Sequence, residues 1–277
     1  MADQRQAVAG VFDRAAATYD QVGVDFFSTV GATLVADVHV AEGAHVLDVG
    51  CGRGAALFPA AAAAGPAGVV LGFDLAPAMV ELTASDAAAR GLTNVTVEVQ
   101  DAQEPRLQAG AFDVVVSSLV VFFLPDPAAA LRTWRAALRP GGRLGLATFA
   151  DRNDQRWAWL REVFPDRDPT STDEREDTGD DYPGPFATDD RLHALLESTG
   201  YRTPVSRTRE HVVTFAAPDA WLRWSWSHGM RMYWERTPEA DRPRAEAQAV
   251  EHLTRMAGEP DGLTLRMVVR YTTASVD

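Results

Sequence analysis

The chain of 277 residues contains no lysine and only one cysteine, Cys51. A single cysteine cannot form an intrachain disulfide, and the histidines and acids show no metal-ligand spacing, so we predict no metal site. The 26 cationic side chains are all arginines, and 39 acids outweigh them to give a net charge of −13. Nucleic-acid binders and proteins on anionic membranes need a surplus of cations. We therefore expect neither a nucleic-acid nor a membrane partner.

The sequence also lacks segments that would direct it to a membrane. Residues 1–6 are polar and precede no apolar stretch of a signal peptide. Residues 55–73 carry no charge, but Pro59 and the Gly-Pro-Ala-Gly turn at 65–68 interrupt this stretch. We interpret 69–73 as a buried strand rather than part of a membrane span. A cytoplasmic protein is expected.

Apolar runs typical of buried strands alternate with helical patterns over most of the chain. Alternating strands and helices are typical of a parallel sheet with helices on both faces. The expected fold class is α/β: a doubly wound, mostly parallel, seven-stranded Rossmann-like sheet with an N-terminal helical cap and a helical insertion before the last strand. The predicted strands are 45–49, 69–73, 95–99, 112–117, 144–149, 205–215 and 263–273.

Changes in composition divide the chain into a core and accessory pieces. Six of the seven tryptophans lie outside the core helices, and the acids at 166–181 form a block. We expect an N-terminal helical cap at 1–38, a cofactor-binding core at 39–150, an acidic loop insertion at 151–187, a core continuation at 188–216, a tryptophan-rich helical cap at 217–260 and the last core strand at 261–277.

The most informative segment is a glycine-rich loop between a predicted strand and a helix. Gly50, Gly52 and Gly54 follow the strand at 45–49. Such a loop lets backbone N–H groups and a helix N-terminus approach a ligand closely. Asp74 ends the second strand, where a carboxylate can accept both hydroxyls of a ribose. The pattern by itself suits either NAD or another adenosine ligand.

Further short segments follow the glycine loop in order and at fitting intervals. Together they resemble the motifs of class I S-adenosylmethionine-dependent methyltransferases of the small-molecule type. That group includes the ubiquinone and menaquinone biosynthesis C-methyltransferases and many natural-product methyltransferases. The resemblance covers residues 10–150 well and the remainder only by general layout. The segments are 12–20 (FDRAAATYD), 48–54 (DVGCGRG), 73–76 (FDLA), 100–102 (QDA), 112–115 (FDVV) and 138–142 (LRPGG).

The resemblance implies S-adenosylmethionine as the cofactor and gives roles to the residues around it. The glycine loop would wrap the methionine part, Asp48 would face the ammonium group, and Asp74 would hold the ribose hydroxyls. Tyr19 would close over the carboxylate. The implied cofactor-binding residues are Tyr19, Asp48, Gly50, Cys51, Gly52, Gly54, Asp74, Ser117 beneath the sulfonium, and Leu75, Met79, Asp101 and Ala102 around the adenine.

The tryptophan-rich segment supplies the predicted acceptor pocket. Trp221, Trp224, His228 and Arg231 are spaced i, i+3, i+7 and i+10, which places them on one face if the segment is a single helix. Such a helix either packs the cap on the core or, together with Phe122, lines a pocket for a large apolar or aromatic metabolite.

Three side chains are candidates for a general base. His228 is the first, and His211 and Glu210 on the predicted sixth strand come second. Residues 119–125 (LVVFFLP) follow the fourth strand, where many relatives carry histidines, so the base used there by other subgroups is missing. A base is needed only if the acceptor carries a proton that it does not lose readily.

We therefore predict an enzyme that moves a methyl group from S-adenosylmethionine to O, N or C of a small apolar or aromatic metabolite of secondary metabolism, by in-line displacement. The sequence does not indicate its oligomeric state. One alternative is an enzyme that uses the cofactor structurally for a reaction such as cyclisation, because its binding motifs would be identical. A second is an NAD-dependent oxidoreductase, although a chain without lysine cannot supply a Tyr-Lys hydride site.

Overall fold

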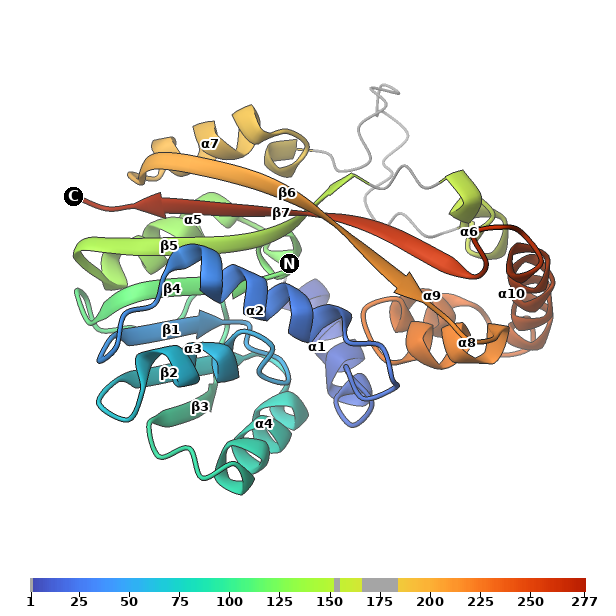
Figure 1. Ribbon diagram of the computed structural model, residues 1–277, viewed down its shortest axis with the longest axis horizontal. Helices are drawn as coiled ribbons and strands as arrows, with labels where there is room; N and C mark the ends of the chain where they lie inside the picture. Colours follow the sequence, from blue (N-terminus) through green and yellow to red (C-terminus); the bar gives the residue numbers. More distant parts are fainter. Residues whose placement is uncertain (1, 152–154, 166–183) are drawn as a thin grey trace.

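The computed structural model describes residues 2–151, 155–165 and 184–277, and the acidic block at 166–181 lies outside them (Figure 1). Its strands are β1 (His45–Val49), β2 (Val69–Asp74), β3 (Val95–Val99), β4 (Phe112–Ser118), β5 (Leu138–Asp151), β6 (Arg202–Thr214) and β7 (Thr264–Ser275). They form one seven-stranded sheet within the described residues, in the order β3-β2-β1-β4-β5-β7-β6. Only β7 runs antiparallel to its neighbours there, so the predicted fold class is confirmed.

Helices cover both faces of the sheet. The core helices are α2 (Phe26–Val38), α3 (Leu57–Ala64), α4 (Pro77–Ala89), α5 (Pro127–Ala137) and α7 (Asp189–Ser198). Successive strand residues point to opposite faces, so Val46 packs in the cluster with α2 and α3, and Leu47 packs in the cluster with α5 and α7. Trp134 of α5 is wholly buried, and its indole N–H donates to the Ala102 carbonyl at 3.0 Å. The central strands are therefore buried on both faces, and for this reason their sequences are continuous runs of apolar residues.

The segment between β6 and β7 forms three helices rather than one. These are α8 (Pro218–Trp226), α9 (Arg231–Arg236) and α10 (Arg242–Ala257). The Ser227 hydroxyl donates to the Trp224 carbonyl at 2.7 Å and so competes for the acceptor that a continuing helix would use. Gly229, two residues later, has a low helix propensity. The helix therefore ends at Trp226.

This break corrects the prediction that four cap residues share one helix face. Trp221 and Trp224 lie on α8, His228 lies in the turn after it, and Arg231 begins α9. The spacing of these residues fits a helical repeat, but the repeat runs across a turn. Their relative positions are therefore set by tertiary packing and not by a common helix.

The N-terminal helix α1 (Ala2–Ala15) lies between the core and the cap (Figure 1). On the core side, the Asp13 carboxylate accepts a hydrogen bond from the Ala78 backbone N–H at 2.7 Å, in the first turn of α4. On the cap side, Arg14 forms an ion pair with Glu235 of α9. One helix therefore connects the two parts of the molecule.

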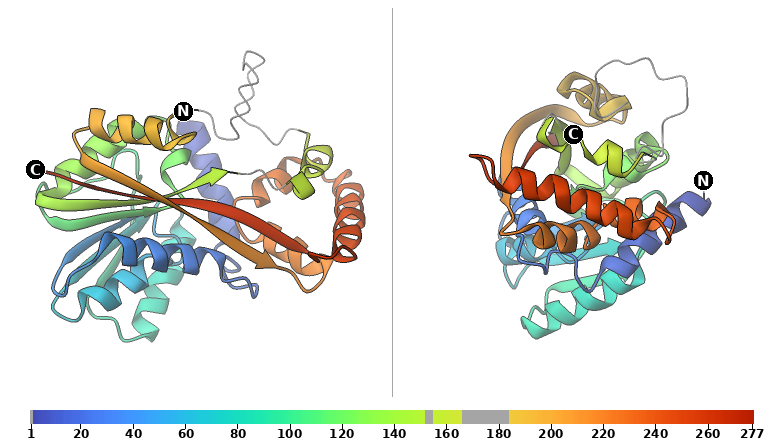
Figure 2. Two further views of the ribbon diagram at one scale, coloured as in Figure 1. Left: turned by 45° about the horizontal axis from the view of Figure 1, so that its top comes forward. Right: turned by 90° about the vertical axis from the view of Figure 1, so that its right-hand side faces the viewer.

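The β6–β7 hairpin extends past β1–β4, and the cap helices gather at its far end (Figures 1 and 2). The apolar cluster is continuous from core to cap, since Val46 of β1, Trp221 of α8 and Leu253 of α10 all belong to it.

Among the described residues, every helix is too short or too polar to span a membrane. The remaining short helices are η1 (Val121–Phe123), η2 (Gln155–Trp157), α6 (Leu160–Val163) and η3 (Gly184–Phe186).

Candidate active site

A small cavity lies at the carboxyl ends of β1 and β4, where the strand order reverses. In open α/β sheets this reversal is the usual place for a ligand. The cavity has a volume of about 30 Å³ and combines glycines, a buried carboxylate and two aromatic rings. Its lining residues are Tyr19, Phe27, Asp48, Gly50, Cys51, Gly52, Arg53, Ala55, Ala56 and Ser118.

The glycine loop has the left-handed backbone that the sequence motif requires. Gly50, Gly52 and Gly54 have φ values of +70°, +49° and +84°. A Cβ atom at Gly50 would lie 2.5 Å from the side chain of Val120, so this glycine permits close packing. A Cβ atom at Gly52 would meet nothing within 4 Å. Gly52 therefore keeps its side of the loop open to a ligand.

Two carboxylates flank this loop, of which Asp48 is buried and Asp74 is half-buried. Asp48 is 1% exposed, its Oδ2 atom has no hydrogen-bond partner, and burial raises its pKa to about 8. Asp74 accepts hydrogen bonds from the backbone N–H groups of Gly52 and Ala76, both at 2.9 Å. Burial raises the pKa of Asp74 as well. A cation in the cavity would meet an unpaired carboxylate oxygen at Asp48.

The residues predicted around an adenine lie just after β2 and β3 and, for Met79, on α4, on the side that α1 covers. Met79 is buried in a small cluster with Ala16 and Ala76, while Leu75 is half-buried. Asp101 forms an ion pair with Arg5 of α1 at 2.5 Å. Ala102 is buried beside Asp101, against Trp134 of α5.

The end of β4 places its two serines differently. Ser117 is wholly buried, and its hydroxyl donates to the Val49 carbonyl at 3.0 Å, which ties β4 to β1. Ser118 lines the cavity instead. The next residue, Leu119, has a left-handed backbone with φ of +59°, and this turn carries the chain over the glycine loop. Ser118 is therefore the serine that can contact a ligand.

Phe26, Phe27, Phe122 and Phe149 form one set of contacting rings, called here the aromatic surface, and it reaches the cavity through Phe27. Tyr19 and Phe27, which both line the cavity, have ring centroids 4.6 Å apart. Phe26 stacks on Phe149 at 6.3 Å, and Phe149 contacts Phe122 at 5.7 Å. Phe122 is one of the residues predicted from the sequence to line a pocket, whereas Phe26, Phe27 and Phe149 are not. The one available signal was the position of Phe149 at the end of a predicted core strand.

His228 lies at the edge of this surface. Its ring contacts Phe27 at 5.4 Å and Trp224 at 4.1 Å between ring centroids. Its Nδ1 atom lies 2.6 Å from the Trp224 carbonyl oxygen, which can only accept, so Nδ1 carries the proton and Nε2 keeps a lone pair. Burial lowers the pKa of His228 to about 4, so the ring is neutral near pH 7.

The other two base candidates lie on opposite faces of β6. His211 packs edge-on against Phe26, and its Nε2 atom lies 2.8 Å from the Tyr271 hydroxyl. Glu210 is half-exposed and pairs with Arg266 of β7 at 2.8 Å. His211 therefore contacts the aromatic surface at Phe26 without lining the cavity, and Glu210 lies on the other face of the strand.

The cap residues predicted for an acceptor pocket divide into two groups. Trp221 is wholly buried, with ring contacts to Trp157 and Trp159 at 5.7 and 5.5 Å. Arg231 pairs with Glu235 at 2.7 Å. The tryptophan contacts join α8 to the segment at 155–165, and the Arg231–Glu235 pair lies within α9. Trp224 is the tryptophan that contacts His228 and so comes nearest to the aromatic surface.

A family model described as "Methyltransferase domain" matches residues 41–195, more than half of the chain. The chain belongs to the methyltransferase family. It is an enzyme of the class I S-adenosylmethionine-dependent type, and S-adenosylmethionine is its cofactor. The predictions of the family, the enzyme class and the cofactor are confirmed, and the comparisons do not favour the cyclase and oxidoreductase alternatives.

Relatives of this methyltransferase include two named enzymes. Nocamycin O-methyltransferase from Saccharothrix syringae is 36% identical over 275 residues, which cover 95% of the chain and 96% of the relative. Aklanonic acid methyltransferase DauC from Streptomyces sp. (strain C5) is 43% identical over 144 residues, or 52% of the chain and 66% of the relative. The YcgJ protein from Bacillus subtilis has a similar fold, with a TM-score of 0.59 and 16% identity over 89% of this chain and 97% of that one.

The residues of the methyltransferase cavity fit its cofactor. The cofactor carries an ammonium group, and the unpaired Oδ2 atom of Asp48 is a buried acceptor suited to a cation. Gly52 leaves open the space that a Cβ atom would fill. Within the described residues no cluster of histidine, cysteine and acidic side chains could hold a metal ion.

Proposed function

We propose that the chain methylates an oxygen atom of a small aromatic acid. The observation that carries the proposal is the aromatic surface of Phe26, Phe27, Phe122 and Phe149 beside the cofactor cavity. Such a surface favours a planar aromatic acceptor. The names of the relatives support oxygen as the target, since one is an O-methyltransferase and the other is named for an acid.

In this proposal the cavity residues hold the cofactor as follows. Asp48 binds the ammonium group through Oδ2, the loop from Gly50 to Gly54 with Cys51 and Ser118 encloses the methionine part, and Tyr19 covers its carboxylate. Asp74 holds the ribose hydroxyls. Leu75, Met79, Asp101 and Ala102 surround the adenine. When bound, the cofactor supplies a methyl group already activated on a sulfonium.

The protein's own contribution is to orient the acceptor and to exclude water. The aromatic surface fixes the plane of the acceptor, and the buried setting keeps water from the reacting oxygen. The Nε2 atom of His228 can accept the proton that a phenolic or enolic oxygen loses. Since burial lowers the pKa of His228 to about 4, it is a weak base. A weak base suits an acidic hydroxyl, and a carboxyl group needs no base because it is already ionised near pH 7.

The test uses acceptors that share one skeleton and differ in the reacting atom. Anthracene bearing a carboxyl, a hydroxyl or an amino group is incubated with the full chain and cofactor labelled with 13C in its methyl group. We expect the label on oxygen, seen by mass spectrometry as a methyl ester or methyl ether. Label on nitrogen or on a ring carbon, or a rearranged skeleton without label, would contradict the proposal.

We also propose that the enzyme acts in the cytoplasm of its source on a diffusible metabolite of secondary metabolism, without a nucleic-acid or membrane partner. The net charge of −13 supports the absence of both anionic partners.

We propose as well that the chain is divided into caps, core and acidic insertion as the sequence predicts. The order of elements supports it, because α8, α9 and α10 lie between β6 and β7.

A further inference from the structure

The cofactor cavity is much smaller than the ligand proposed for it. Its volume is about 30 Å³, whereas sites for drug-sized ligands have about 300–1,000 Å³. Part of the lining must therefore move before the cofactor can enter. Most lining residues lie at the ends of β1 and β4 or in the glycine loop, which the sheet holds in place. Tyr19 differs, because it lies in the connection between α1 and α2.

The position of Tyr19 depends on the end of α1. The backbone N–H of Tyr19 donates to the Ala15 carbonyl at 2.9 Å, so Tyr19 continues the last turn of that helix. Its ring also contacts Phe12 of α1, with 6.2 Å between the ring centroids. A displacement of the end of α1 therefore carries Tyr19 with it and opens the cavity.

One side chain of the glycine loop holds the end of α1. The Nη1 atom of Arg53 donates to the Ala16 carbonyl at 2.6 Å, and its Nη2 atom pairs with Asp86 of α4 at 2.6 Å. The side chain of Arg53 is only 9% exposed, so water competes little for these contacts. Arg53 therefore joins the glycine loop, α4 and the end of α1.

The glycine loop and α4 form the fixed side of this junction. The hydroxyl of Thr83, which is wholly buried, donates to the Gly52 carbonyl at 2.7 Å. Thr83 and Asp86 are three residues apart and lie on the same face of α4. That face therefore holds the loop at Gly52 and at the guanidinium of Arg53. The hydrogen bond to Ala16 is the part of the junction that can open.

The ion pairs that α1 makes with its own arginines are more exposed. Arg5, which pairs with Asp101, is 25% exposed, and Arg14, which pairs with Glu235, is 52% exposed. Ion pairs that are open to water contribute little to stability. Of these three arginines, Arg53 therefore makes the contact that holds α1 most firmly.

We propose that Arg53 is a positioning residue that latches the end of α1, and with it Tyr19, over the bound cofactor. Breaking the hydrogen bond from Arg53 to the Ala16 carbonyl opens the cavity, while Asp86 keeps the guanidinium in place for closure. The latch thereby controls how fast the cofactor enters and leaves. This inference rests on the proposed placement of the cofactor at the glycine loop.

The test measures the rate constants of S-adenosylhomocysteine binding to the full chain by surface plasmon resonance. In Arg53→Gln we expect both rate constants to rise, because the cavity opens more often. Dissociation should rise more than association, so that Kd increases about tenfold, since a hydrogen bond from a charged group is lost. Loss of a direct contact with the ligand would raise the dissociation rate constant alone.

A second latch variant, Asp86→Asn, separates the latch from direct contact with the ligand. Asp86 does not line the cofactor cavity, and its substitution only loosens the guanidinium of Arg53. We expect both rate constants to rise in Asp86→Asn as well, but less than in Arg53→Gln.

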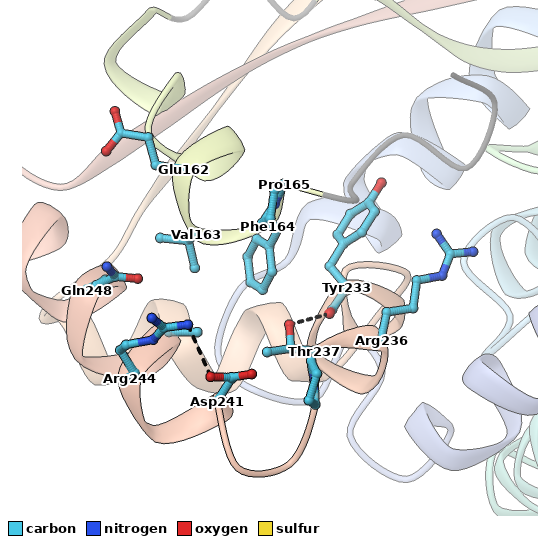
Figure 3. A pocket seen from close by; sticks show the side chains of 12 residues that line it. Glu162, Val163, Phe164, Pro165, Tyr233, Arg236, Thr237, Asp241, Arg244 and Gln248 are labelled. Carbon is cyan, nitrogen blue, oxygen red and sulfur yellow. Dashed lines mark hydrogen bonds and ion pairs between the residues drawn. The ribbon is translucent and has the colours of Figure 1, made fainter. Parts of the chain in front are cut away.

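The matched control is Arg244→Gln, which also breaks an arginine–aspartate pair. Arg244 pairs with Asp241 at 3.1 Å beside a separate cavity of about 250 Å³ in the cap (Figure 3). That cavity shares no lining residue with the cofactor cavity. Both rate constants should therefore stay unchanged in Arg244→Gln.

Proteolysis without ligand tests whether Arg53 holds α1. Because the chain has no lysine, trypsin cleaves it only after arginine. Arg14 lies in the last turn of α1 and reports on its release. Mass spectrometry of the N-terminal peptides should show faster cleavage after Arg14 in Arg53→Gln and Asp86→Asn, and an unchanged rate in Arg244→Gln.

The outcomes separate the latch from the placement of the cofactor. Rate constants that are unchanged in both latch variants would overturn the proposal. A faster dissociation alone in Arg53→Gln, with Asp86→Asn unchanged, would also overturn it in favour of a direct contact. An unchanged Kd in Asp48→Asn would instead contradict the placement of the cofactor, and cleavage after Arg14 would still show whether Arg53 holds α1.

Discussion

At the scale of single residues, the cofactor cavity is lined by one buried carboxylate, Asp48, whose burial is costly without a cation. A buried ionised carboxylate loses hydration, and this burial raises the pKa of Asp48 to about 8. Without a ligand, Asp48 is therefore mostly protonated at pH values below about 8. Asp74 accepts two backbone hydrogen bonds, which replace part of the hydration that its carboxylate loses. The Oδ2 atom of Asp48 accepts no hydrogen bond. Asp48 is therefore the group that gains most from a cationic ligand.

The first prediction concerns the charge of Asp48. Asp48→Asn keeps the shape and removes the charge, so we expect the Kd of S-adenosylmethionine to rise about tenfold to a hundredfold, since a hydrogen bond to a charged group contributes about 1.5–3 kcal/mol. Calorimetric titration measures this change. Asp113→Asn is the control, because Asp113 pairs with Arg139 at the amino end of β4 and should leave the affinity unchanged.

The raised pKa also gives the direction of the pH dependence. The pKa of Asp48 is 3.8 in the unfolded chain and about 8 in the folded protein. Between these two pH values the folded protein therefore keeps a proton on Asp48 that the unfolded chain has lost. Its contribution to stability is therefore complete at low pH and is lost as the pH rises to about 8. Cofactor affinity changes the opposite way and should rise between pH 5.5 and 7.5. In Asp48→Asn this rise should be absent, and an equal rise in both proteins would contradict the assignment.

The second prediction concerns His228. For a phenolic acceptor, His228→Ala should lower kcat about a hundredfold, the usual contribution of a positioned base. For a carboxylic acid of the same skeleton, kcat should change little. The Kd of the cofactor should stay constant for both. His211→Ala is the control, since the Nε2 atom of His211 is already engaged by the Tyr271 hydroxyl at 2.8 Å. An equal loss of kcat with both acceptors would assign His228 a structural role.

At the scale of secondary-structure elements, the core could be predicted because each buried strand is an apolar run bounded by turns. β1, β3 and β4 match the predicted strands to within a residue. β5 begins at Leu138 instead of residue 144, because Leu138 already pairs with Phe112 of β4 and the Pro-Gly-Gly sequence is accommodated in an irregular ladder. The start of β5 depends on pairing with a strand that is distant in the sequence, so the residues around 138 do not predict it.

The candidate site could be predicted only in part, for a similar reason. The cofactor residues lie in short motifs at strand ends, and their order along the chain identifies them. The aromatic surface joins Phe26 of α2, Phe122 of η1 and Phe149 of β5, which are far apart in the sequence. Packing alone brings them together. The turn after α8 was missed because its residues continue a helical spacing.

The third prediction concerns the contact between α1 and α4. Asp13→Ala removes the acceptor for an N–H group in the first turn of α4, so we expect the free energy of unfolding to fall by about 1 kcal/mol. Since α1 packs over Met79, the Kd of the cofactor should also rise. Thr188→Ala removes a comparable cap from α7, on a different helix, and should lower stability alone. Equal cofactor affinity in the two variants would show that α1 does not support the site.

At the scale of the whole molecule, cap and core share one apolar cluster. The cluster runs from β1 through α2 to the tryptophans of α8 and the buried face of α10. The β6–β7 hairpin crosses the same boundary as continuous backbone, and α1 bridges it with Asp13 on one side and Arg14 on the other. A cap joined in this way has little capacity to unfold while the core stays folded.

The fourth prediction follows from this continuity. Tryptophan fluorescence reports mainly on the cap and its surroundings, because six of the seven tryptophans lie outside the core helices, whereas far-ultraviolet circular dichroism reports on the whole chain. We expect both signals to change at the same urea concentration. Trp221→Ala should lower the free energy of unfolding by about 3–5 kcal/mol and shift both transitions together, since it opens a cavity in the shared cluster. A fluorescence transition that precedes the circular dichroism transition would show instead that the cap unfolds on its own.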